Sequence, residues 1–78
     1  MSGNISFHDR KHLLYEALVA HYDAKRADAL ATLQVYFDNA AGIGEHPQIV
    51  EEMAKQLEKL ANAEDCLEAL QRNFTHQQ

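Results

Sequence analysis

Three residues near the start of the chain have the types and the spacing of a metal site. His8, His12 and Glu16 follow one another at intervals of four, so a helix would place all three side chains on one face. A pair of histidines four apart on a helix is one way to hold zinc. The metalloprotease pattern H-E-x-x-H is absent, and Arg10 and Lys11 between the histidines would oppose a cation. We therefore predict solvated helix surface here, with a metal-binding face as the alternative.

The single cysteine, Cys66, is the other candidate for chemistry. An antiparallel hairpin could bring it to the height of His21, which makes a Cys–His pair conceivable. The acidic neighbours Glu64, Asp65 and Glu68 would oppose a thiolate by charge repulsion. We predict a packing residue, no catalytic residue, and no disulfide within the chain. A lone thiol fits a reducing cytoplasm.

Composition and charge disfavour several classes of partner. The chain of 78 residues carries 12 acidic and 7 basic residues, a net charge of −5, which is the wrong sign for a phosphate backbone. It contains no apolar run near the ~20 residues that cross a bilayer, and its first ten residues lack the apolar core of a signal peptide. The pair Gly42 and Gly44 follows no strand, so no dinucleotide site is expected. We predict a cytoplasmic protein without nucleic-acid, membrane or cofactor binding.

The elements that must position these residues are two helices in one domain spanning residues 1–78. No helix breaker occurs from about residue 7 to residue 41, and a helix of that length would measure about 50 Å. Residues 42–46 form a turn in which Gly42 can end the first helix, and Pro47 suits the first position of a second helix ending near residue 74. Long helices joined by so short a turn lie antiparallel. The sequence therefore predicts an all-α, antiparallel two-helix hairpin.

The second helix has one apolar stripe and one charged side. The stripe follows alternating steps of four and three, as in coiled-coil packing, and Gln56 is its single polar member. Its members are Ile49, Met53, Gln56, Leu60, Ala63, Leu67, Leu70 and Phe74. Leu57 and Val50 widen this stripe, and charged residues cover the other side of the helix.

The first helix has two apolar stripes, and this is the main clue to assembly. One is small and runs from Leu13 through Ala17, Ala20, Ala24, Ala27 and Ala31; the other is bulky and contains Tyr15, Leu18, Val19, Tyr22, Ala29, Leu30, Leu33, Tyr36 and Phe37. A hairpin offers one partner helix, which covers one stripe and leaves the other in water. We therefore predict a homo-oligomer, most simply a four-helix bundle formed by homodimerisation. The expected interface contains Leu13, Ala17, Ala20, Ala24, Ala27, Ala31, Leu60 and Leu67, and which stripe faces the second helix stays open.

The segment from Tyr36 to Glu52, YFDNAAGIGEHPQIVEE, resembles a segment of small uncharacterised helical proteins of tailed bacteriophages, especially marine ones. Those proteins share a G-I-G-E-H-P turn followed by an acidic amphipathic helix that ends near an A-x-A-E-D-x-L pattern, whose last six positions are represented here by Asn62 to Leu67. The resemblance covers roughly residues 33–70 and implies an infected bacterial cell. It carries no activity, so no site residue is transferred.

These observations favour a non-enzymatic, homo-oligomeric helical protein that acts by binding another protein, as an accessory or host-directed phage protein would. A metal-binding helical protein that uses His8, His12 and Glu16 is one alternative. A structural component of a virion is another.

Overall fold

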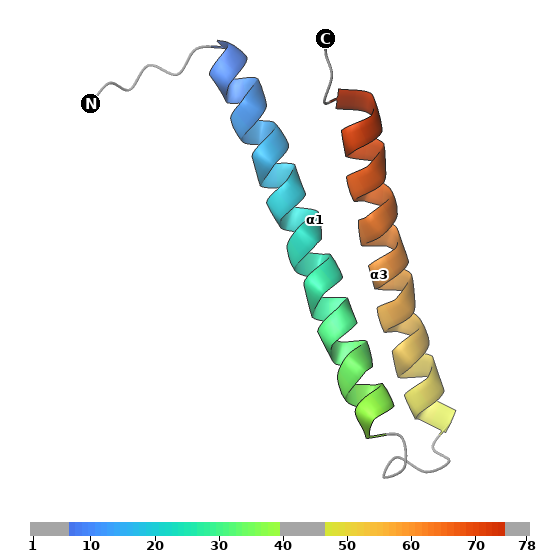
Figure 1. The fold of residues 1–78 in the computed structure, drawn as a ribbon. Helices are drawn as coiled ribbons and strands as arrows, with labels where there is room; N and C mark the ends of the chain where they lie inside the picture. The colour runs from blue at the N-terminus through green and yellow to red at the C-terminus, as the bar shows by residue number, and fades with distance from the viewer. Residues whose placement is uncertain (1–6, 40–46, 75–78) are drawn as a thin grey trace, which may run out of the picture.

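The computed structural model describes residues 7–39 and 47–74, and gives side chains for residues 12–39 and 48–74. The described residues form two helices, α1 (Phe7–Asp38) and α3 (Pro47–Phe74), which pack against each other. Figure 1 shows them side by side and antiparallel, with the start of α1 and the end of α3 at the same end of the molecule. The predicted all-α hairpin is therefore confirmed.

The ends of the helices lie close to the expected positions. Helix α1 ends at Asp38, earlier than the Ala41 that we expected, and Asn39 forms a turn. The Asn39 backbone N–H is shared between the carbonyls of Val35 (3.1 Å) and Tyr36 (3.2 Å), and its side-chain amide also donates to Val35 at 2.8 Å. Shared hydrogen bonds of this kind are common where a helix ends. Pro47 is the first residue of α3, as predicted.

The bulky stripe of α1 faces α3. The buried and half-buried positions of α1 alternate by four and three residues, which matches the period of a helix packed along its length. They are Tyr15, Val19, Tyr22, Arg26, Ala29, Leu33 and Tyr36, with Thr32 at the edge. Leu18, Leu30 and Phe37, which we placed in the same stripe, lie at its margins and are exposed.

The predicted stripe of α3 faces α1 along nearly its whole length. Every member from Ile49 to Leu70 is buried or half-buried, whereas Phe74 at the end of the helix is 71% exposed. Val50 and Leu57, which we expected to widen this stripe, are exposed. The side chains of Lys59 and Asp28 form an ion pair between the helices and help to fix their register.

The core between the helices is thin. Among the described residues only Ala29, Leu33 and Ala63 are buried, and the two alanines are completely inaccessible. Small side chains let two helix axes approach closely. Toward the chain ends the helices diverge (Figure 1), and larger side chains such as Tyr22 and Leu70 line the wider space between them.

The hairpin exposes much more surface than a compact chain of its mass. Its accessible surface is 6144 Å², against about 4,800 Å² for a typical compact monomer of this size. Its radius of gyration is 18.0 Å, against about 11.5 Å for a compact domain. Within the described residues, neither helix combines the length and apolar character that crossing a membrane requires.

Candidate interaction surface

The side of α1 that points away from α3 carries a continuous apolar surface. A helix turns by about 100° per residue, so positions two apart point to nearly opposite sides. Tyr22 faces α3 and Ala24 therefore points away from it; Leu33 faces α3 and Val35 points away. We call this surface the outer face of α1, and its members, all exposed, are Leu13, Ala17, Ala20, Ala24, Ala27, Ala31 and Val35.

The structure answers which stripe of α1 packs within the hairpin. The bulky stripe is inside, and the alanines that we predicted for the oligomer interface are on the surface. We did not predict Val35 as a member of this stripe, although it lies four residues beyond Ala31 and so continues the spacing of the stripe. Leu60 and Leu67, which we grouped with the alanines, are half-buried on the side of α3 that faces α1. They do not share a surface with the outer face.

The outer face itself contains no charged residue, and its two flanks do. Glu16 and Asp23 lie along one flank, and His21 and Asp28 lie along the other. Asp23 is paired with the guanidinium of Arg26, whose Nη2 lies 2.9 Å from the Asp23 Oδ1. An apolar strip bordered by charged side chains is the usual form of a helix surface that binds a protein.

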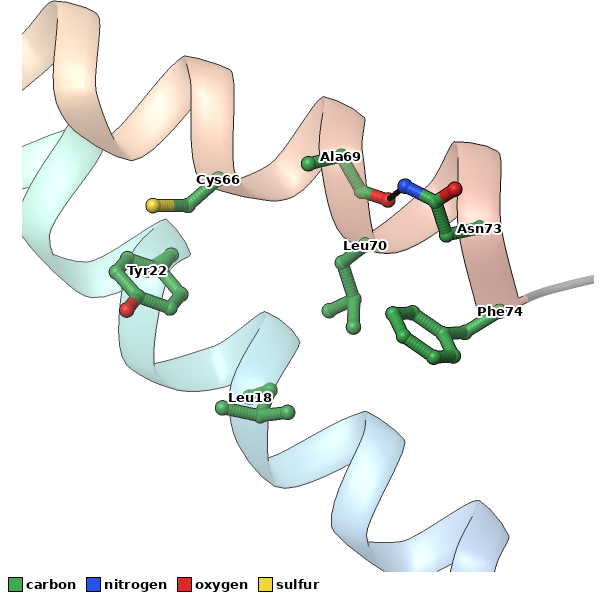
Figure 2. Close-up of a pocket in the computed structure, with 7 residues that line it drawn as sticks. All are labelled: Leu18, Tyr22, Cys66, Ala69, Leu70, Asn73 and Phe74. Atoms are coloured by element: carbon green, nitrogen blue, oxygen red, sulfur yellow. Dashed lines mark hydrogen bonds between the residues drawn. The ribbon is translucent and has the colours of Figure 1, made fainter.

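A second candidate site is an apolar groove of about 270 Å³ between the helices, near the chain ends. Figure 2 shows it between α1 and α3, with Cys66 and Tyr22 opposite each other on one side and Phe74 at the other. Its lining residues are Leu18, Tyr22, Cys66, Ala69, Leu70, Asn73 and Phe74. The Asn73 amide is already used, because it donates to the Ala69 carbonyl of its own helix at 2.7 Å. The groove is therefore lined chiefly by apolar groups.

Tyr22 interacts with both members of the Cys–His pair suggested by the sequence. Hydrogen bonding by the Cys66 side chain, then electrostatic interaction with it and burial, raise the pKa of the Tyr22 hydroxyl above 10.0. The His21 ring packs edge-to-face against the Tyr22 ring, with 4.8 Å between centroids and 88° between planes. Among the described contacts, Cys66 and His21 thus meet Tyr22 rather than each other.

The proposed metal face is described only in part. His12 Nε2 lies 3.0 Å from Glu16 Oε2, and both side chains are well exposed. His8 belongs to α1, but its side chain lies outside the described residues, as do Gly42 and Gly44 of the predicted turn. Within the part of the chain that is described, no three His, Cys, Asp or Glu side chains are grouped closely enough to hold a metal ion.

Comparison of the chain with protein-family models, with curated proteins and with solved structures gives no match. The resemblance to phage proteins therefore stays a prediction, and the outer face of α1 has to be interpreted from its own chemistry.

Proposed function

We propose that this protein is a non-enzymatic, homo-oligomeric binding protein that associates through the outer face of α1. One observation carries the proposal: α1 is apolar on two opposite faces, and α3 covers only one of them. A helix that is apolar on opposite faces is normally enclosed between two partners. The second partner must then come from outside the hairpin.

The thin core supports the same proposal. Small domains with little buried apolar surface usually need a disulfide, a metal or a partner subunit to stay folded. Here the side chains buried in the described residues are two alanines and one leucine. Association through the outer face would therefore bury apolar surface that the hairpin leaves exposed, and would stabilise the folded chain.

The test is the mass of the purified protein, compared between two matched variants. Ala24→Glu places a charge in the middle of the outer face, whereas Ala54→Glu places the same charge at an exposed alanine of α3. We expect wild type and Ala54→Glu to be oligomers by light scattering after size exclusion, and Ala24→Glu to be monomeric or unfolded. A wild-type protein that is helical at 8.8 kDa would contradict the proposal.

The cellular setting follows from the sequence rather than from the fold. We place the protein in the cytoplasm, and in an infected bacterial cell if the phage resemblance holds. There the oligomer would act as an accessory protein by binding another protein, through the side surfaces that remain after association. The large exposed apolar residues of α1 on those sides are Leu14, Leu18, Leu30 and Phe37.

A metal-binding role is the second candidate, favoured by the contact between His12 and Glu16. Elemental analysis of purified protein, with thermal unfolding in the presence and absence of chelator, tests it. Bound zinc that is lost in a His12→Ala variant would support this role. If the purified protein contains no metal and chelator leaves its melting temperature unchanged, the metal-binding role is ruled out.

A further inference from the structure

The side chains of the outer face are arranged symmetrically about Ala24. Leu13 and Val35 each lie eleven residues from Ala24, and Ala17 and Ala31 each lie seven residues from it. Ala20 and Ala27 lie four and three residues away on either side. Small side chains thus occupy the middle of the face, and larger ones occupy both ends.

We propose that two copies of this chain pair through their outer faces in antiparallel orientation, about a two-fold axis that passes beside Ala24. This inference rests on the proposed self-association and specifies its geometry. Two helices that cross are closest at one point, where small residues are needed, and separate toward both ends, where larger residues can fill the space. A two-fold contact also requires a surface that is complementary to itself. In this arrangement Ala17 meets Ala31 of the second copy, and Leu13 meets its Val35.

The flanking charges are compatible with the antiparallel orientation but do not select it. In the antiparallel pair, His21 of each copy lies within about one residue rise of Asp28 of the other, and the two Asp23 side chains lie about two residue rises apart on the opposite flank. Within each copy Asp28 is already paired with Lys59, and Asp23 with Arg26. In a parallel pair, His21 would lie about two residue rises from Asp23 of the other copy. The antiparallel orientation therefore rests on the symmetric sizes of the outer-face side chains, to which antiparallel helix dipoles add a small favourable term.

The shape of the assembly follows from the position of the outer face. Because that face lies opposite α3, the two α1 helices form the centre of a row and the two α3 helices form its outer layers. This row is one way to arrange the four helices of the homodimer that we expected from sequence. It agrees with the surface of α3, whose far side carries exposed charged residues such as Glu51, Lys55 and Glu58.

Disulfide trapping tests the orientation. In a Cys66→Ser background that is first shown to keep the wild-type mass, a cysteine is introduced singly at Ala24, Ala17 or Ala31, and at the exposed Glu58 as control. Alanine-lined helices bring facing Cα atoms within reach of a disulfide, whose Cα atoms are about 4.4–6.8 Å apart. Residues 17 of the two copies would lie about 21 Å apart, which is too far.

We expect Ala24→Cys to form a covalent dimer on the order of ten- to a hundred-fold faster than Glu58→Cys. Ala17→Cys alone should match the control, and a mixture of Ala17→Cys with Ala31→Cys should crosslink efficiently. Fast self-crosslinking of Ala17→Cys would show a parallel pair and overturn this geometry. A protein that is dimeric by mass, with control rates at every position and in the mixture, would also overturn it while leaving self-association intact. If the Cys66→Ser protein and the wild type are both monomeric, the proposed self-association itself is wrong.

Discussion

Helices α1 and α3 have similar lengths, 32 and 28 residues, but they distribute their apolar residues differently. Helix α3 has one apolar side, which faces α1, and its other side is charged. Helix α1 has apolar residues on two opposite sides and keeps its charges on the flanks. In the assembly that we propose, this difference places α3 in an outer layer and α1 in an inner one.

The largest effect should come from a charge on the inner face of α1. Ala29 is completely inaccessible between the helices, so Ala29→Glu must either bury a carboxylate or separate the helices. We expect this variant to lose its helical circular dichroism at every protein concentration. A folded Ala29→Glu protein with wild-type stability would show that the helices do not pack as described.

The next effect compares the two faces of α1 at two neighbouring aliphatic residues. Leu33→Ala, inside the hairpin, should lower the free energy of unfolding by about 2–4 kcal/mol. Val35→Ala, two residues further and 60% exposed in the single hairpin, should lower it by a smaller amount, because the second copy would cover its side chain. Urea unfolding at one fixed protein concentration measures both. If Val35→Ala leaves the midpoint unchanged, Val35 lies outside the interface.

A substitution at Gln56 should have a smaller effect on stability, and should raise it instead of lowering it. Its Oε1 atom is buried in the stripe of α3 without a hydrogen-bond partner. Gln56→Met keeps a similar volume and removes the unsatisfied group, so we expect a gain of about 1 kcal/mol in unfolding free energy. Gln48→Met, at an exposed position of α3, is the control and should change little. A loss of stability in Gln56→Met would indicate that the amide has a structural role.

The smallest effect concerns the pKa of Tyr22. Because the Cys66 side chain raises this pKa, Cys66→Ala should move it back toward 10.0, as measured by the ultraviolet absorbance of tyrosinate with Tyr22→Phe as the reference. The linked stability is present below the unfolded pKa near 10 and is lost as pH rises through the higher folded value. An unchanged titration in Cys66→Ala would show that the thiol does not act on Tyr22.

The sequence predicted the hairpin because periodicity, the glycine-containing turn and Pro47 all indicate the same division of the chain. It predicted the stripe of α3 equally well, since that helix has only one apolar side. It left open the orientation of α1, because both of its stripes could accept a partner. Arg26 was missed at the contact face, since only the folded hairpin shows the long side chain lying half-buried with its guanidinium on Asp23. The relation of Tyr22 to Cys66 likewise depends on helix register, which the sequence leaves open.

The central claim is that a second copy covers the outer face of α1 and that the hairpin depends on it. Sedimentation equilibrium and circular dichroism of the wild-type protein, measured together over a wide range of concentrations, test this most directly. We predict a mass of about twice 8.8 kDa at high concentration, with mass and helix content falling together on dilution. A fully helical chain of 8.8 kDa at every concentration would contradict the claim.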